Sequence, residues 1–165
     1  MPKLAELNAM DRVEFVRAVG PVFEHSPWVA ARTEGQRPFQ SREALHAALV
    51  ATVAKASDHE KLSLIRAHPD LIGDGDVTAA SGAEQASAGL QDATAGEAKQ
   101  FREFNRQYRE RFGFPFVICA RLNKKEAIAQ AFPVRLRNAR EQEMETALEE
   151  ISKIAELRLK DLVDE

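Results

Sequence analysis

His68 is the side chain of this sequence best suited to exchanging a proton near neutral pH, because the ordinary pKa of imidazole lies close to 7. It follows a predicted helix over residues 58–67, which must end there because Pro69 disfavours helical backbone in the residue before it. The unpaired carbonyls at that helix end favour the protonated ring. A purely structural histidine, bonded to one of those carbonyls, is the alternative, and position alone favours it by about two to one.

Ser81, Glu84 and Gln85 form the second candidate group. Ser81 and Glu84 have the spacing of a capping box, in which each side chain bonds the backbone N–H of the other residue. The box predicts a helix that begins at Ser81, and it accounts for Ser81 and Glu84 but not for Gln85. Backbone N–H groups at such a helix start also suit an anionic or carbonyl-bearing ligand. A structural role and a binding role are therefore equally favoured.

Arg158 is the third candidate, because it lies on the apolar stripe of the predicted last helix, seven residues after Ile151 and four before Leu162. A guanidinium at such a position needs anionic or carbonyl partners, since an unpaired buried charge costs several kcal/mol. A structural salt bridge and a binding site account for it about equally well. Three other arginines of this region are interpreted as surface charge: Arg135, Arg137 and Arg140.

Other classes of protein are disfavoured by what the sequence lacks. Cys119, the single cysteine, lies in an apolar run and is expected to be a buried small hydrophobe rather than a nucleophile. The four histidines have no metal-ligand spacing, and the sequence has neither a Gly-rich phosphate loop nor a serine nucleophile elbow. A net charge of −3 without a basic block argues against nucleic acid. No apolar run reaches the roughly 20 residues that span a bilayer.

A helical repeat of apolar residues dominates the chain and predicts one all-α domain of roughly eight helices over residues 1–165. Asn8 is expected to cap the first helix, with Val13, Val16 and Val19 on its buried side. Residues 114–120 are apolar and fit either a buried extended segment or the start of a helix. Further helices are expected over residues 28–32, from a cap at Ser41 to 56, from a cap at Thr94 to Gly113, over 123–132, and after Pro133.

Five blocks of the sequence, taken together, resemble one protein family. The blocks are FEHSPW (23–28) with RPF (37–39), IRAHPDL (65–71), Ser81 with EQ (84–85) and AGL (88–90), FGFPFVICAR (112–121), and ALEEISKIAELRL (147–159). They resemble the 2-oxo-4-hydroxy-4-carboxy-5-ureidoimidazoline (OHCU) decarboxylases, in that family's order and at its length. Five ordered blocks are far more specific than any single one.

The resemblance implies an all-helical, usually dimeric enzyme that needs neither a metal nor an organic cofactor. His68 would be the catalytic histidine, with Glu84 and Arg158 completing the catalytic set. Pro69, Ser81 and Gln85 would line the substrate pocket. The segment that would present backbone amides to the substrate consists of Phe116, Val117, Ile118, Cys119 and Ala120.

The resemblance further implies a reaction and a place in metabolism. The small-molecule substrate would be OHCU, which the enzyme would decarboxylate to (S)-allantoin in urate catabolism. The single cysteine suits a reducing cytosol, so a cytoplasmic location is expected. One departure from the family is visible, because only residues 74–80 separate Gly73 from Ser81, where other members have a longer and often basic stretch. This short segment contains Asp74 and Asp76, which puts the closure of the pocket on that side in question.

Two alternatives are weighed against this function. The first is a non-enzymatic helical interaction module with a degenerate pocket. A J-domain co-chaperone, whose signature is also His68-Pro69-Asp70, is rejected because those domains place it after a basic helix and have about half this length. A module would also have no use for His68, Glu84, Gln85 and Arg158 together. A decarboxylase acting on a different ureido or hydantoin compound would keep the same fold.

Overall fold

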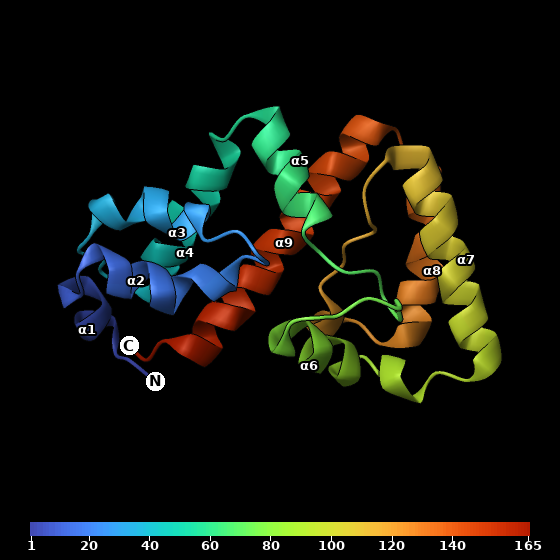
Figure 1. The fold of residues 1–165 in the computed structure, drawn as a ribbon, viewed down its shortest axis with the longest axis horizontal. Coiled ribbons are helices and arrows are strands. Elements are labelled where there is room, and N and C mark those ends of the chain that lie inside the picture. Colours follow the sequence, from blue (N-terminus) through green and yellow to red (C-terminus); the bar gives the residue numbers. More distant parts are fainter. The chain divides into compact units, whose positions relative to one another are not determined.

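The chain folds into two compact units in a computed structural model that describes residues 1–165. The first unit comprises residues 1–67 with 152–165, and the second comprises residues 68–151. Nine α-helices and four short 3-10 helices make up the fold, with no strand (Figure 1). The all-α class predicted from the sequence is therefore confirmed. The single domain expected over residues 1–165 stays a prediction, because each unit is described by itself.

The helices divide between the units along the sequence. The first unit holds α1 (Leu4–Ala9), α2 (Arg12–Val19), α3 (Trp28–Thr33), α4 (Arg42–Ala54) and α5 (Asp58–Arg66). The second holds α6 (Ala79–Ser87), α7 (Ala95–Phe112) and α8 (Lys125–Leu136). The last helix, α9 (Arg140–Leu162), supplies its first part to the second unit and its last part to the first. The 3-10 helices are η1 (Gly20–Val22), η2 (Glu34–Gln36), η3 (Leu90–Asp92) and η4 (Ala120–Leu122).

The start of the first unit differs from the sequence prediction. Asp11 rather than Asn8 caps α2, accepting a bond from the Glu14 N–H at 2.8 Å. Asn8 lies in α1 and exchanges two hydrogen bonds of 2.9 Å with the backbone of Phe39. Val13 is 64% exposed. The buried residues of α2 are Phe15 and Val19, so of the three valines expected on the buried side Val19 is buried and Val16 is half-buried.

Two features fix the rest of the first unit. Ser41 caps α4 as predicted, with its hydroxyl accepting from the Ala44 N–H at 3.0 Å, and Leu45, Leu49 and Val53 form its buried stripe. The two ends of the chain lie side by side (Figure 1), joined by a bond of 2.6 Å from the Leu4 N–H to the carbonyl of Asp164.

In the second unit, α6 begins earlier than predicted and α7 begins where predicted. Thr78 is the N-cap of α6, and its hydroxyl accepts from the Ser81 N–H at 3.2 Å. Ser81 therefore lies inside the first turn, and the predicted capping box of Ser81 and Glu84 is wrong. Thr94 forms the predicted capping box with Glu97, and Gly113 ends α7 with a φ of 79°.

An aromatic core packs α7 and α8 against the segment that follows α7. Phe116 stacks on Phe132 with ring centroids 3.8 Å apart, and Tyr108 meets Phe116 edge to face at 5.4 Å. Residues 114–119 are not helical, and all of them are buried except Ile118, which is half-buried. Of the two alternatives for this segment, the buried extended one is therefore correct. Pro133 lies inside α8 rather than before the last helix. The helix continues past it to Leu136.

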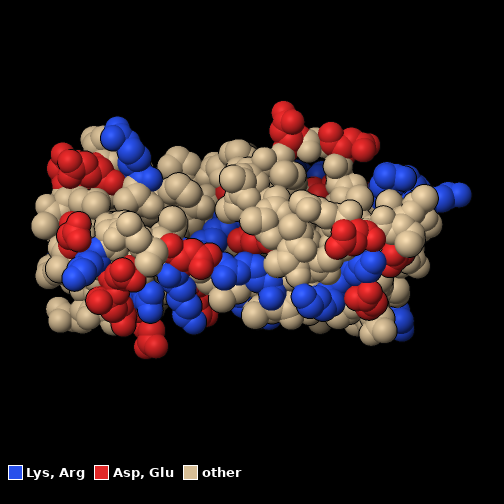
Figure 2. All heavy atoms as spheres, turned by 90° about the horizontal axis from the view of Figure 1, so that it is seen from below, with Lys and Arg blue, Asp and Glu red and all other residues tan.

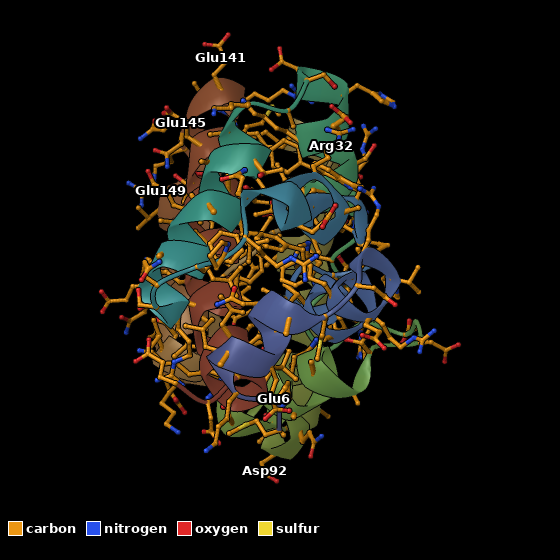
Figure 3. The ribbon with its side chains drawn as sticks, turned by 90° about the vertical axis from the view of Figure 1, so that its left-hand side faces the viewer. Glu6, Arg32, Asp92, Glu141, Glu145 and Glu149 are labelled. Carbon is orange, nitrogen blue, oxygen red and sulfur yellow. The ribbon has the colours of Figure 1, made fainter.

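The acidic residues of α9 lie on opposite sides of the helix. Figure 3 shows Glu141, Glu145 and Glu149 pointing outward, and all three are exposed. Glu143 and Glu150 lie instead on the buried stripe, together with the apolar residues Ala147 and Ile151. Periodicity therefore predicts the buried face of this helix correctly, but that face carries more charge than expected.

The charged surface is mixed in sign. Figure 2 shows Lys and Arg side chains interspersed with Asp and Glu over the face that it draws. No helix has both the length and the apolar character that crossing a membrane requires.

Candidate active site

His68 opens the second unit and begins the loop that leads to α6. The helix before it, α5, ends at Arg66, within one residue of the predicted end. The His68 side chain is buried, at 7% exposure, and Pro69 beside it is half-buried. The loop that carries this imidazole has no regular backbone hydrogen bonding of its own. The position of the His68 backbone therefore depends on side chains from other elements that bond the loop.

Side chains from two helices anchor the loop after Pro69. Gln85 of α6 accepts a bond from the Ile72 N–H at 3.1 Å and donates one to the Asp70 carbonyl at 3.3 Å. Asn105 of α7 donates to the Leu71 carbonyl at 2.8 Å. The backbone of residues 70–72 is thus bonded at three consecutive positions.

The helix α6 brings the loop and the segment 116–120 to one place in the second unit. It packs against η4, which begins at Ala120. The carbonyl of Ala88, just after α6, accepts from the Lys125 N–H at 2.9 Å. Ser81 is buried and Glu84 is half-buried. Burial raises the pKa of the Cys119 thiol, and the negative charges of Glu150 and Glu84 raise it further, so Glu84 lies within electrostatic reach of the segment.

Several backbone groups of the segment 116–120 are already bonded within the protein. The Cys119 N–H donates to Oε1 of the buried Glu150 at 3.1 Å, and the Val117 carbonyl accepts from Arg135 at 2.7 Å. The Cys119 amide is therefore not directed at a ligand, which corrects the expectation that the whole segment presents its amides. Cys119 itself is buried and free of any disulfide, as a small hydrophobe would be.

Arg135 is a buried structural cation, so its interpretation as surface charge is wrong. Its Nε donates to Glu143 at 2.7 Å, and Glu143 also accepts from the Tyr108 hydroxyl at 2.6 Å. The guanidinium lies 4.1 Å from the centroid of the Phe116 ring. Burial and the neighbouring carboxylate raise the pKa of Tyr108. This network holds the segment 116–120 in place through the contacts of Arg135 with the Val117 carbonyl and the Phe116 ring.

Arg158 lies in the first unit, on the buried stripe of α9 as predicted, and is 4% exposed. Its guanidinium lies 3.5 Å from a carboxylate oxygen of Glu24 and donates to the Pro21 carbonyl at 3.1 Å. The anionic and carbonyl partners expected for a buried arginine are thus present. Of the predicted site residues, Arg158 alone belongs to the first unit, while His68, Pro69, α6 and the segment 116–120 belong to the second.

Comparison with known proteins shows the family of this chain. The sequence profile of the OHCU decarboxylase family matches residues 8–160. The chain belongs to the OHCU decarboxylase family. A relative from Haloferax volcanii named 2-oxo-4-hydroxy-4-carboxy-5-ureidoimidazoline decarboxylase is 45% identical over 156 residues, which cover 94% of this chain and 93% of the relative.

Two solved structures extend the family resemblance to the fold. A crystal structure of (S)-allantoin synthase aligns with a TM-score of 0.83 and 30% identity over 99% of this chain and 54% of its own. A crystal structure of OHCU decarboxylase in the presence of (S)-allantoin aligns with a TM-score of 0.71 and 25% identity, over 93% of this chain and 98% of that one. An interaction module of the J-domain kind is thereby excluded as the family of this chain.

Several buried polar residues that contact the predicted site residues, their loops or the side chains that hold them were not singled out from the sequence. Glu24, Glu143 and Glu150 are buried carboxylates. A usable signal exists for Glu143 and Glu150, since both fall on the apolar stripe of α9, as Arg158 does. Asn105 falls on the inward face of α7, four residues after Phe101, and a polar residue at such a position needs a partner. Arg135 sits on the same side of α8 as Phe132 and Ile128, which is the equivalent signal.

Proposed function

We propose that this chain decarboxylates OHCU to (S)-allantoin in urate degradation. The observation that carries the proposal is the family match over nearly the whole chain, together with a relative of that name at 45% identity over almost equal lengths. A buried histidine on a loop anchored to α6 supports it. The resemblance assigned catalysis to the same histidine.

The substrate itself can accept the electron pair that decarboxylation leaves behind. When the bond between the ring carbon and the carboxylate breaks, CO₂ leaves and the electron pair passes into the conjugated, nitrogen-rich ring. The hydroxyl on that carbon then loses its proton and becomes a carbonyl, while a proton is added at the neighbouring ring carbon, which bears the ureido group. Only delivery to one face of this second carbon gives a single enantiomer. The protein therefore has to hold the carboxylate out of the ring plane, stabilise negative charge and deliver one proton.

His68 is proposed as the acid and base that moves this proton. Glu84 would orient either the imidazole or the ureido N–H groups of the substrate. Arg158 would bind a ring or ureido carbonyl. A tight grip of Arg158 on the departing carboxylate would stabilise the ground state and slow the reaction, so that role is not assigned to it.

Two roles expected from the resemblance are reassigned. Gln85 has both ends of its amide bonded to the loop, so we assign it to holding the loop rather than to reading the substrate ring. The Cys119 amide is bonded to Glu150, so we assign it to holding the segment rather than to binding the substrate. Pro69 and Ser81 keep their proposed places beside the substrate.

The remaining expectations belong to the proposal as well. We expect the reaction to need no metal and no organic cofactor. We expect a homodimer that works in the cytoplasm. A decarboxylase for a different ureido or hydantoin compound is the second candidate, and substrate competition would reveal it.

A single assay tests the activity. OHCU is generated in situ from urate by enzymatic oxidation and hydrolysis, and (S)-allantoin is followed by circular dichroism with and without the purified chain. The proposal predicts faster decarboxylation and an excess of the (S) form, since protonation free in solution occurs on both faces. A signal equal to that of the reaction without protein would contradict it.

A further inference from the structure

The loop that carries His68 is held by side chains rather than by its own backbone. Gln85 binds residues 70 and 72, and Asn105 binds residue 71. Arg109, one turn after Asn105 on α7, donates to the Asp70 carboxylate at 2.8 Å. Every residue from 70 to 72 is therefore tied to α6 or α7, immediately after His68-Pro69.

The loop also has a conformation that requires such support. Ile72 has a φ of 55°, a left-handed backbone that is a true outlier for a β-branched residue. Gly73 follows it, and a Cβ there would come within 3.0 Å of the Asp70 Cβ. A strained turn of this kind persists only where its surroundings over-determine it. The bonds from Gln85 to either side of the turn do so here.

Asn105 has an unusual hydrogen-bonding state that points to the same role. Its side chain is 5% exposed, its Nδ2 is used on the Leu71 carbonyl, and its Oδ1 has no partner. A buried acceptor without a partner is destabilising, so the fold tolerates a cost at this position in order to place one donor on the loop. A leucine of nearly the same shape would remove that unpaired oxygen.

We propose that Asn105, together with Gln85 and Arg109, is a positioning residue for catalysis, which fixes the His68 imidazole by holding the backbone of residues 70–72. The inference rests on the proposed function, because it assigns to the loop the task of presenting an acid–base group. None of these three side chains needs to touch the substrate for the role. Their effect passes through His68.

The test compares Asn105→Leu with Phe101→Leu, a buried substitution one turn earlier on the same helix that leaves the loop bonds intact. We expect kcat of Asn105→Leu to fall by roughly 10- to 100-fold, as misplacement of a catalytic group by about 1 Å does. KM should stay within about twofold, since substrate contacts remain. Phe101→Leu should lower the melting temperature and leave kcat unchanged.

A double-mutant cycle separates positioning from simple destabilisation. In the His68→Ala background, Asn105→Leu should cause no further loss of the residual (S)-selective rate, because the group that it positions is gone. An equal loss in both backgrounds, or an unchanged kcat of Asn105→Leu, would overturn the inference. Absence of activity in the wild-type chain would instead overturn the proposed function.

A second pair of variants keeps the test decisive if Asn105→Leu does not fold. Arg109 and Arg106 are both exposed on α7, but only Arg109 contacts the loop, while Arg106 binds Glu103 and Glu110. Arg109→Met should lower kcat about threefold, and only when His68 is present. Arg106→Met should leave kcat unchanged. Equal effects of the two arginines would contradict the positioning role.

Discussion

Arg135 and Glu143 illustrate how individual residues decide the stability of the second unit. The pair is joined at 2.7 Å, and Glu143 is fully buried at 0% exposure, with Asn138 donating to its second oxygen at 2.9 Å. A buried ion pair adds little by comparison with an apolar pair of the same shape, but removal of one partner leaves an uncompensated charge. The pair therefore matters most when it is broken.

Glu143→Gln should lower the free energy of unfolding by about 3–5 kcal/mol, because Arg135 would keep its charge in a buried place without a counterion. Urea denaturation measures the change. Glu141→Gln, two residues earlier on the exposed side of α9, is the matched control and should stay within about 0.5 kcal/mol of the wild type. Equal stability of the two variants would show that the Arg135 charge has other compensation.

We expect the Cys119 thiol to make the free energy of unfolding depend on pH in the alkaline range. Burial raises its pKa in the folded state above the unfolded value near 9.0, so the folded chain holds its proton at pH values where the unfolded chain releases it. This contribution to stability is complete below pH 9 and is lost as the pH rises toward the folded pKa. The wild type should therefore lose more free energy of unfolding between pH 8 and 10 than Cys119→Ala. Parallel pH profiles would contradict the shift.

Prediction from sequence succeeded for the burial and the pairing of Arg158, whichever role that residue has. Arg158 on an apolar stripe had to be buried and paired, and it is. Arg135 was missed because Pro133 was expected to end its helix, which hid the buried side that it shares with Phe132. The bonds of Gln85 to the loop join residues 13 and 15 positions apart, and that of Asn105 joins residues 34 positions apart, and no local pattern encodes such a distance.

Among the elements, helix starts with a single strong capping candidate were predictable. Thr94 with Glu97, and Ser41, cap α7 and α4 as expected. Where two candidates lie three residues apart, as Thr78 and Ser81 or Asn8 and Asp11 do, the wrong one was chosen in both cases. Local hydrogen-bonding capacity is the same at both positions, so tertiary packing decides between them.

The cap of α7 should have a measurable energy. Thr94→Ala removes the hydroxyl that accepts from the Glu97 N–H at 3.1 Å, and should cost about 1 kcal/mol of stability. Gln100→Ala, an exposed substitution within the same helix, should stay within about 0.5 kcal/mol of the wild type in the same thermal or urea measurement. If Thr94→Ala lowered the stability by no more than Gln100→Ala does, the cap would contribute nothing measurable.

At the scale of the whole molecule, the order of the sequence blocks predicted the family, and helical periodicity predicted the fold class. Neither could predict that the chain divides into two units that share α9. Contact density within each part of the chain decides that division, and it depends on packing between residues far apart in sequence. Arg158 is the predicted site residue that this division assigns to the first unit, whereas the other predicted site residues belong to the second.

Arg158 has a structural partner in Glu24 and a proposed partner in the substrate, and paired variants separate the two roles. Arg158→Met should cost on the order of 3 kcal/mol, because the buried Glu24 loses a counterion. Glu24→Gln combined with Arg158→Met should recover part of that stability, while KM stays raised if the guanidinium binds substrate. A double variant with both stability and KM restored would leave Arg158 only its structural role.

The most direct test is the rate of (S)-allantoin formation by His68→Ala, compared with His59→Ala, which changes an exposed histidine of α5. Circular dichroism at matched protein concentration follows both, after a melting curve has shown that each variant is folded. We expect His68→Ala to lose on the order of 10²-fold or more in kcat and His59→Ala to keep the wild-type rate. Turnover by folded His68→Ala near that of His59→Ala would contradict the assignment of the acid and base.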